Sequence, residues 1–456
     1  MMREPAFSLL PQPPRMELRG RRVLVLGLGD TGLSVARWVE RQGGTPSVAD
    51  TRRAPPRGKD FSGELKTGPF TAALLERVDL ICVSPGLSLH EGLIQQAIAK
   101  GIPVVGDVEL FAWQNRAPVL AITGTNGKTT VASLTGHLLK SAGVDCEVAG
   151  NISPPVLDSF LKRKNPPATW VLELSSYQLE TTWSLAPHAA AMLNLTEDHL
   201  DRYPSLDEYG AAKARIFRGA GVQVVNRDDP RSLAMARGGA RVVSFGVDAK
   251  ADFGLQDGVL LHLGAPILRA DELQIHGSHN VANALAACAL AHSLGIPTSR
   301  IKKGLTTFRG LPHRVERIAL RRGVEWYDDS KGTNVGATIA ALRGLGRKTV
   351  LILGGEGKGQ DFSPLRQPVA QFARAVLLIG RDAPLIEKAL SGLPTERCAT
   401  LEIAVEKAAE IAKAGDAVLL SPACASFDMF RDYRHRGDAF AAALRKLPPA
   451  TEGPSA

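Results

Sequence analysis

The chain has 456 residues, of which 44% are hydrophobic, and its net charge is +9. Its length exceeds what one hydrophobic core supports, and we expect about three domains. The basic residues are dispersed and aromatic residues make up only 5%, which argues against a nucleic-acid-binding protein. No apolar run approaches the roughly 20 residues of a membrane span, so we expect no membrane partner. Five scattered cysteines without C-x-x-C spacing indicate a reducing cytoplasm rather than a disulfide or zinc framework.

The first segment has the pattern of a small doubly wound α/β domain over residues 1–106. Residues 1–19 are rich in proline at their start, and we predict a disordered extension there. A buried strand from Arg22 then leads into Gly27, Gly29 and Gly32, which form G-x-G-x-x-G, and Asp50 ends the next strand. An acidic residue at that place can bind a ribose hydroxyl, so a nicotinamide dehydrogenase is one interpretation of this segment.

The second segment, residues 107–311, contains a phosphate-binding loop at Ile122-Thr123-Gly124-Thr125-Asn126-Gly127-Lys128-Thr129-Thr130. The loop follows an apolar strand and precedes a helical pattern, so its backbone N–H groups and the helix dipole would face an anion. Lys128 would reach the terminal phosphates and the Thr129 hydroxyl would bind Mg²⁺. The common pattern has glycine at position 122, where this chain has isoleucine, and the difference disfavours GTPases and kinases.

Polar residues follow the next strands of this segment, at the edge where ligands collect in open α/β sheets. Glu173 closes one strand, and a carboxylate facing the phosphate loop is a natural Mg²⁺ ligand. The following strand ends in a polar cluster with His199, in which we interpret Asp198 and Asp201 as capping or turn residues. Lys213 is the lone charge in a run of small residues, which by itself indicates a surface position.

A long helix near the end of the second segment places Asn280 and Asn283 one turn apart on one face. Two amides there could bind a base edge or cap the helix, and the residues alone leave both interpretations open. The third segment, residues 312–456, again alternates strand and helix, and Gly-, Ser- or Lys-bearing clusters at its strand ends indicate a substrate mouth. The predicted fold is therefore α/β in three domains: a Rossmann-like N-terminal domain, a central ATPase-like domain with a parallel sheet, and a Rossmann-like C-terminal domain.

These segments together resemble the Mur ligase family, ATP-dependent amide-forming enzymes of peptidoglycan synthesis, over nearly the whole chain from about residue 20. Within the family, the clusters 50–52, 173–180, 196–204, 329–331 and 421–427 resemble those of the ligases that join D-glutamate to UDP-N-acetylmuramoyl-L-alanine. The resemblance implies that ATP phosphorylates the L-alanyl carboxylate and that the D-glutamate amine attacks the acyl phosphate. It further implies a cytoplasmic, monomeric enzyme and makes the first domain a UDP-sugar site rather than a nicotinamide site.

The resemblance also implies roles for single residues. Lys128, Glu173, His199 and Lys213 would be catalytic; Mg²⁺ would be held by Thr129 and Glu173, and a second Mg²⁺ by His199 and Lys213, the lysine being carbamylated by CO₂. The positions that contact UDP-sugar would be Asp30, Thr31, Asp50, Thr51, Arg52, Ser84, Gly86, Asn151 and Gln178. ATP would also be bound by Asn283, Arg314 and Asp329. D-Glutamate would be surrounded by Lys331, Thr333, Lys358, Ser426, Phe427 and Tyr433.

Three rival functions stay open on the sequence. A sister ligase with another amino acid, or the related folate polyglutamate-forming enzyme, shares the phosphate loop, Glu173 and Lys213, and differs in the clusters 50–52 and 421–427. A dehydrogenase leaves the phosphate loop unexplained. A non-catalytic nucleotide-binding regulator would lack Lys128, Glu173 or His199, and this chain has all three.

Overall fold

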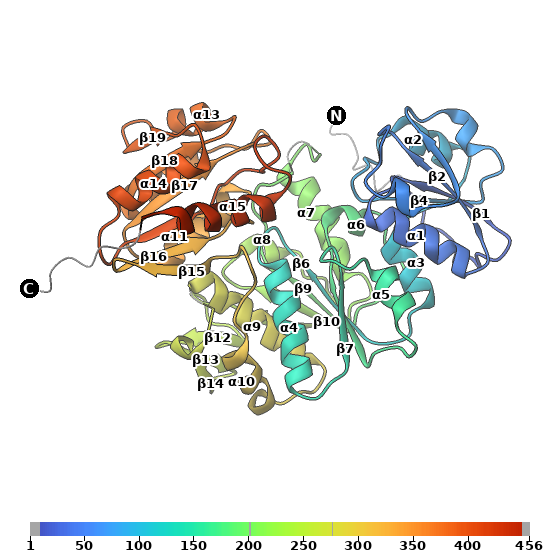
Figure 1. The fold of residues 1–456 in the computed structure, drawn as a ribbon. Coiled ribbons are helices and arrows are strands. Elements are labelled where there is room, and N and C mark those ends of the chain that lie inside the picture. Colours follow the sequence, from blue (N-terminus) through green and yellow to red (C-terminus); the bar gives the residue numbers. More distant parts are fainter. Residues whose placement is uncertain (1–9, 200–201, 276, 449–456) are drawn as a thin grey trace, which may run out of the picture.

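The computed structural model describes residues 10–199, 202–275 and 277–448. Three β-sheets follow one another along the chain, each flanked by helices, and they lie side by side with the central one lowest in the view (Figure 1). The predicted three-domain α/β fold is thereby confirmed. Among the described residues, no helix combines the length and apolarity that a bilayer crossing requires.

The first sheet has five parallel strands in the order β3-β2-β1-β4-β5, the doubly wound arrangement that the G-x-G-x-x-G pattern predicts. Its strands are β1 (Arg22–Leu26), β2 (Thr45–Asp50), β3 (Glu64–Thr67), β4 (Leu80–Val83) and β5 (Val104–Val105), and its helices are α1 (Asp30–Arg41) and α2 (Gly92–Ala99). Leu10 and Leu18 are buried against this domain, which differs from the disordered extension expected through residue 19. Residues 1–9 of that extension lie outside the described part of the chain.

The central sheet has nine strands in the order β14-β13-β12-β11-β10-β9-β6-β8-β7. The strands are β6 (Val119–Thr123), β7 (Cys146–Gly150), β8 (Thr169–Glu173), β9 (Ala189–Met192), β10 (Val222–Asn226), β11 (Arg241–Phe245), β12 (Phe253–Gln256), β13 (Val259–His262) and β14 (Ala265–Arg269). The strands from β6 to β12 pair in parallel, as predicted, but β12, β13 and β14 form an antiparallel extension that the sequence interpretation missed.

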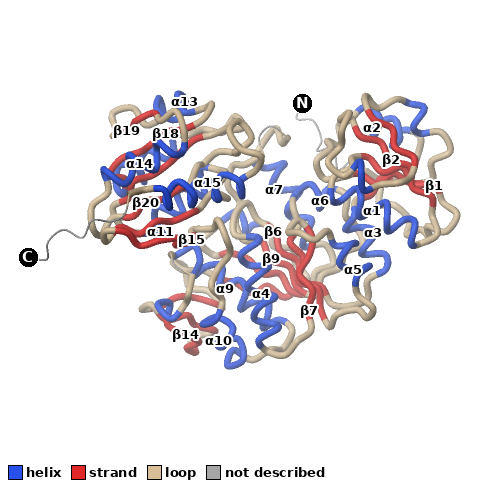
Figure 2. The backbone as a smooth tube through the Cα atoms, viewed as in Figure 1, coloured by secondary structure: helices blue, strands red, loops and turns tan. Residues whose placement is uncertain are grey.

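Helices cover both faces of the central sheet, and α4, α9 and α10 pack together on one of them (Figure 2). The helices of this domain are α3 (Asp107–Gln114), α4 (Lys128–Ser141), α5 (Val156–Lys162), α6 (Ser176–Glu180), α7 (Leu206–Ala214), α8 (Pro230–Ala234), α9 (Ser278–Ser293) and α10 (Thr298–Thr307). The alanine-rich α9 is buried over most of its length because its small side chains let it approach α4 and the sheet closely.

The third sheet has six strands in the order β15-β16-β20-β17-β18-β19. Its strands are β15 (Glu316–Arg321), β16 (Val324–Asp328), β17 (Thr349–Gly354), β18 (Ala373–Ile379), β19 (Thr395–Arg397) and β20 (Ala417–Leu420), and only β15 pairs antiparallel. Its helices are α11 (Val335–Leu345), α12 (Arg366–Phe372), α13 (Ala383–Ala389), α14 (Leu401–Ile411) and α15 (Tyr433–Lys446).

The hydrophobic cores connect the domains unequally. One cluster of buried residues joins the first domain, from Leu18 to Val105, with central residues from Val108 to Val225. The clusters of the third domain contain only residues from Val315 onward. Within the described residues, the first two domains therefore share a core and the third has its own.

Candidate active site

A cavity of about 520 Å³ lies where the carboxyl ends of the first sheet face the central domain. All nine residues predicted to contact UDP-sugar line it: Asp30, Thr31, Asp50, Thr51, Arg52, Ser84, Gly86, Asn151 and Gln178. Seven come from the first domain and two from the central domain. Because five separate stretches of the chain converge on one hollow, the prediction that these residues belong together is consistent with the geometry.

The glycine turn after β1 lets the backbone approach a ligand in this cavity. Gly27 has a φ of 90°, and a Cβ at Gly32 would lie 1.9 Å from the Gly27 carbonyl oxygen, so neither position accepts a larger residue. The turn leads directly into α1, whose first residues Asp30 and Thr31 line the cavity, so the start of a helix borders it, a place that favours anions.

The Asp50 carboxylate at the end of β2 is buried and held from two sides. It accepts hydrogen bonds from the Leu28 N–H at 2.7 Å and from the Arg52 guanidinium at 2.6 Å. Burial opposes ionisation of Asp50, but these hydrogen bonds outweigh it and lower the pKa to about 2. Asp50 is therefore ionised at neutral pH, and it fixes the half-exposed Arg52 at the cavity wall.

The two central-domain residues of the cavity are oriented by neighbours. Gln178 forms a capping box with Ser175 at the start of α6, and its amide lies 3.4 Å from both carboxylate oxygens of the buried Asp107. The Asn151 amide donates to Glu173 Oε1 at 2.7 Å. Glu173 ends β8 beside the strand that leads into the phosphate loop, so Asn151 connects the first cavity with that loop's surroundings.

The phosphate loop connects β6 to α4 as predicted. Gly127 caps α4 with a φ of 83°, and a Cβ there would meet Asn283 Oδ1 at 2.5 Å. Lys128 Nζ donates to the carbonyl oxygens of Gly124 and Thr125, at 2.9 and 2.8 Å. The ammonium is thereby folded back over its own loop, and burial lowers its pKa.

A second cavity, of about 540 Å³, opens between the phosphate loop, α9 and the third domain. Of the residues predicted to bind ATP, Asn126, Gly127, Thr130, Asn283, Arg314 and Asp329 line it. Gly124, Thr125, Lys128 and Thr129 belong to the same loop but are not part of this lining. Asn283 Nδ2 donates to Asn280 Oδ1 at 3.1 Å along the wall. The N-cap of α9 is Gly277 and both asparagines lie inside the helix, so the helix-cap interpretation is wrong and the base-edge interpretation stays a prediction.

Glu173 and Lys213 are both buried beside the phosphate loop. Glu173 Oε2 has no hydrogen-bond partner among the described residues, although it is shielded from solvent. Lys213 Nζ donates to the Gly124 carbonyl at 2.8 Å, the same oxygen that accepts from Lys128, and lies 4.6 Å from the Tyr209 ring centroid. Burial and the neighbouring Lys128 lower the Lys213 pKa far below its ordinary value. The sequence alone indicates a surface position for Lys213, and the structure contradicts that because the small residues around it pack into the core.

His199 lies in a left-handed turn with a φ of 57° and its ring packs against Tyr177 and Tyr209. Burial, with only partial compensation by Asp198, lowers its pKa to about 4. The imidazole is therefore neutral at pH 7 and able to act as a metal ligand.

The third domain brings its own polar residues to the phosphate loop. Arg314 donates to Thr129 Oγ1 at 2.6 Å. Asp329 Oδ2 accepts from Ser421 at 2.7 Å, and burial raises the Asp329 pKa to about 7. Lys331 lies 4.1 Å from the Tyr433 ring centroid, and burial lowers its pKa to about 8.

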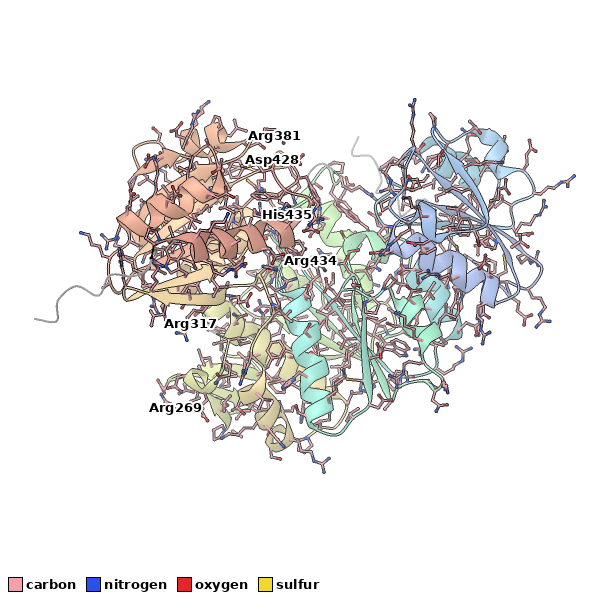
Figure 3. All side chains as sticks on the ribbon, viewed as in Figure 1. Arg269, Arg317, Arg381, Asp428, Arg434 and His435 are labelled. Carbon is pink, nitrogen blue, oxygen red and sulfur yellow. The ribbon has the colours of Figure 1, made fainter. Side chains whose placement is uncertain are left out.

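The residues predicted to surround D-glutamate are less closely gathered. Lys331 lines the nucleotide cavity, whereas Thr333, Lys358, Ser426, Phe427 and Tyr433 do not. Ser426 is buried and the Phe427 side chain is 71% exposed. Figure 3 shows Arg434 and His435, next to Tyr433, at the end of α15 nearest the central domain.

The sequence analysis missed the roles of Asn194 and Asp107 and only partly anticipated that of Asp198. Asn194 holds the loop through the Asn126 N–H at 2.8 Å, and Asp107 orients Gln178. Asp198, interpreted as a capping residue, does accept the His199 N–H, but it also accepts from Lys358 and Asn334 of the third domain. Asp201 lies outside the described residues. The contacts of Asn194, Asp107, Lys358 and Asn334 join residues 68 to 160 positions apart, and such contacts leave no local signal in the sequence.

Comparison with known proteins matches three family profiles in succession. They are the Mur ligase MurD-like N-terminal domain over residues 21–106, the Mur ligase middle domain over 122–291, and the Mur ligase glutamate ligase domain over 313–424. Among solved structures, MurF from Acinetobacter baumannii is similar with a TM-score of 0.62 at 19% identity, covering 95% of this chain and 93% of that chain. MurC from Thermotoga maritima gives 0.61 at 20% identity, covering 93% of this chain and 99% of that chain.

Two curated relatives are far closer in sequence. The UDP-N-acetylmuramoylalanine--D-glutamate ligase of Thiobacillus denitrificans is 54% identical over 95% of this chain and 98% of its own length. The enzyme of the same name from Nitrosospira multiformis is 52% identical over 96% of this chain and 98% of its own length. Because the matches run through all three domains, the chain belongs to the Mur ligase family.

Proposed function

We propose that this protein joins D-glutamate to UDP-N-acetylmuramoyl-L-alanine and hydrolyses ATP to ADP and phosphate in doing so, as a step of peptidoglycan precursor synthesis. It is an ATP-dependent ligase, and relatives that are 48% to 54% identical to it bear the name UDP-N-acetylmuramoylalanine--D-glutamate ligase. The single observation that carries the choice of substrate is the cavity in which all nine predicted UDP-sugar residues meet.

The reaction needs an activated carboxylate, because hydroxide is too poor a leaving group for a direct attack by an amine. ATP transfers its γ-phosphoryl group to the L-alanyl carboxylate, with release of ADP. The neutral D-glutamate amine then attacks the acyl carbon, the C–O bond to phosphate breaks and inorganic phosphate leaves. The nitrogen gives up one proton to that phosphate or to solvent, and the amide is formed. Lys128 neutralises charge on the transferred group, and the N–H groups of the phosphate loop orient it.

The residues at the strand end fit a divalent cation. Glu173 Oε2 is buried without a partner, and Thr129 Oγ1 and a neutral His199 offer further ligands that hard or borderline cations accept. Thr129 and Glu173 would hold one Mg²⁺, and His199 with Lys213 a second. When bound, Mg²⁺ would offset the repulsion between phosphate and carboxylate.

We further propose that Lys213 is carbamylated. The amine reacts with CO₂ only when it is neutral, and burial beside Lys128 favours the neutral form. The product is an anion, which would attract the ammonium group of Lys128 that contacts the same Gly124 carbonyl.

The remaining assignments follow from this reaction. Residues 1–106 would bind the UDP-sugar, 107–311 would bind ATP and 312–456 would bind D-glutamate. Thr333, Lys358, Ser426, Phe427 and Tyr433 would complete the amino-acid site with Lys331 at the junction of the third and central domains. We place the enzyme in the cytoplasm as a monomer.

The deciding experiment measures ADP release from UDP-N-acetylmuramoyl-L-alanine, ATP and Mg²⁺ with a panel of D- and L-amino acids. We expect release with D-glutamate at least about a hundredfold above that with L-glutamate or L-lysine, because a chiral polar site rejects misplaced charged groups strongly. Equal release with another amino acid would assign the protein to a sister ligase. No release with any member of the panel would overturn the proposed function.

A further inference from the structure

Asn334 lies outside every predicted binding set, yet its side chain contacts two domains. It is 4% exposed and precedes α11, where its Oδ1 accepts the Ala337 N–H at 2.8 Å as an N-cap. Helix capping requires only an acceptor, and serine or aspartate would serve as well. The amide nitrogen of Asn334 therefore takes no part in capping α11.

The Asn334 amide group forms hydrogen bonds with the central domain. Asn334 Nδ2 donates to Asn126 Oδ1 at 3.1 Å, and Asn126 Nδ2 donates back to Asn334 Oδ1 at 3.3 Å. The two side chains are 208 positions apart in sequence and form a reciprocal amide pair. Asn126 belongs to the phosphate loop, and Asn194 fixes it in turn by accepting its backbone N–H.

The same Asn334 nitrogen also lies 3.1 Å from Asp198 Oδ2. The other oxygen of Asp198 accepts from Lys358 Nζ at 3.4 Å and from the His199 N–H at 2.9 Å. Asp198 thus links the turn that carries His199 to two third-domain residues. One of those, Lys358, is predicted to bind D-glutamate.

We propose that Asn334 is a positioning residue that sets the third domain against the phosphate loop, so that the amino-acid site is aligned with the carboxylate being activated. The proposal rests on the proposed function. It requires an amide at position 334, because an acceptor alone caps α11 but cannot donate to Asn126 or Asp198. Asn334 would touch neither ATP nor D-glutamate and would act through Asn126, Asp198 and Lys358.

The test separates capping from positioning. Asn334→Ser retains a capping oxygen and removes the amide, and Thr400→Ala removes an N-cap of α14 in the same domain without touching the central one. We expect Asn334→Ser to keep its melting temperature and its affinity for UDP-N-acetylmuramoyl-L-alanine. Its kcat should fall by at least about tenfold and its KM for D-glutamate should rise, since small misplacements of reacting groups have such effects. Thr400→Ala should lose thermal stability and keep both kinetic parameters.

A double-mutant cycle with Asn126→Ser tests the pairing itself. If the amide pair positions the domain, Asn126→Ser combined with Asn334→Ser should reduce kcat less than the product of the two single effects. Should Asn334→Ser fail to fold, Asn334→Asp replaces it, because it also caps α11 and lacks the donor. Wild-type kinetics in the folded position-334 variant, or strictly multiplicative effects in the cycle, would overturn the proposal. Inactivity of the wild type with D-glutamate would instead refute the proposed function.

Discussion

Two lysine side chains meet at one backbone oxygen. Lys128 and Lys213 both donate to the Gly124 carbonyl, at 2.9 and 2.8 Å, although they are 85 positions apart in the sequence (213 − 128). Two ammonium groups in contact with one acceptor repel each other, and burial of Lys213 strengthens that repulsion. The arrangement favours a change in which one of them meets anionic phosphate and the other loses its positive charge.

For Lys128, we expect the alanine variant to lose turnover by about a hundredfold or more, because it removes a charge that stabilises the transferred phosphoryl group. Binding of UDP-N-acetylmuramoyl-L-alanine should be almost unchanged, since its cavity does not include Lys128. Calorimetric titration and ADP-release kinetics measure the two effects. Lys140→Ala, on the exposed end of the same helix, should change neither. An equal loss of UDP-sugar affinity in Lys128→Ala would contradict the separation of the two sites.

For Lys213, we expect Lys213→Ala to be inactive and partly reactivated by acetate, which can enter the vacated space and supply a carboxylate. Depletion of bicarbonate should lower the activity of the wild type only. Lys128→Ala is the matched control, because acetate cannot replace a cation. Full activity of Lys213→Ala without acetate would show that the lysine has no catalytic part.

The raised pKa of Asp329 leads us to expect that its contribution to the stability of the protein decreases as the pH rises. Burial raises its pKa from 3.8 to about 7, so the folded state holds a proton that the unfolded state releases above pH 4. Stability from this group is thus complete below about pH 4 and decreases as the pH rises to about 7. Asp329→Asn should flatten that decrease in the urea-unfolding midpoint of the ligand-free protein.

Asp416 provides the opposite case as a control. A hydrogen bond from Arg374 lowers its pKa, so its contribution is present at neutral pH and is lost as the pH falls below about 4. Asp416→Asn should therefore reduce stability more at pH 7 than in acid, and the difference from the wild type should shrink as the pH falls below about 4. If Asp329→Asn changed the midpoint equally at all pH values, the raised pKa of Asp329 would be refuted.

Single residues were predictable where a motif fixes local geometry. Gly127, Lys128 and Thr129 follow from the loop pattern, and Glu173 follows from its place at a strand end. Asp198 and Asn334 were not predictable in their cross-domain contacts, since those depend on how two separately folded domains meet. For Lys213 the local sequence is misleading: it indicates a surface position, but tertiary packing buries the side chain.

At the scale of elements, the parallel strands were predictable because each is a short buried run followed by a polar or glycine cluster. The strands of the antiparallel extension β12-β13-β14 are short and only partly buried, so their sequences contain no long apolar run that would predict a strand. Its two tight turns do carry a signal. All four residues of Asp257-Gly258 and Leu263-Gly264 have positive φ. Asp-Gly is a common dipeptide of two-residue hairpin turns, so the first turn could have been predicted from the sequence.

The segment between α10 and β15 has the features of a hinge, which we predict at Leu311-Pro312-His313. His313 and Val315 have φ values of 62° and 48°, which is unusual for residues with a Cβ and most of all for valine. Carboxylates hold the segment: the His313 N–H donates to Glu316, its ring to Asp328 at 2.7 Å, and the Val315 N–H to Asp329. The structure thus concentrates backbone strain at the domain connection.

The first two domains are joined by aromatic packing between helices. Phe160 of α5 lies 5.3 Å from Trp38 of α1 and 5.8 Å from Trp170 of β8, measured between ring centroids. We expect Phe160→Ala to lower the free energy of unfolding by about 3 kcal/mol, the lower end for a large aromatic because Phe160 is partly exposed. Denaturant unfolding measures this. Leu385→Ala, at a side chain that is 58% exposed, should change stability by less than about 0.5 kcal/mol. Equal effects of the two variants would exclude a shared core.

Across the whole molecule, the two domain junctions differ in chemistry. The first and central domains share a hydrophobic cluster, whereas side-chain hydrogen bonds at and beside the phosphate loop join the central and third domains. Apolar junctions of large area resist motion, and small polar ones allow it. We therefore expect the first two domains to move as one body and the third to turn about Leu311-Pro312-His313.

That difference predicts how the molecule responds to its substrates. The proposed ATP contacts are divided between the central domain, with Lys128 and Asn283, and the third, with Arg314 and Asp329, so we expect them to engage together only in a closed molecule. Closure would also exclude water that hydrolyses the acyl phosphate. Small-angle scattering should therefore give a smaller radius of gyration with ATP and UDP-N-acetylmuramoyl-L-alanine than without ligand. Lys128→Ala with the UDP-sugar alone is the control and should stay open. An unchanged radius in a fully active wild-type sample would show that catalysis requires no closing third domain.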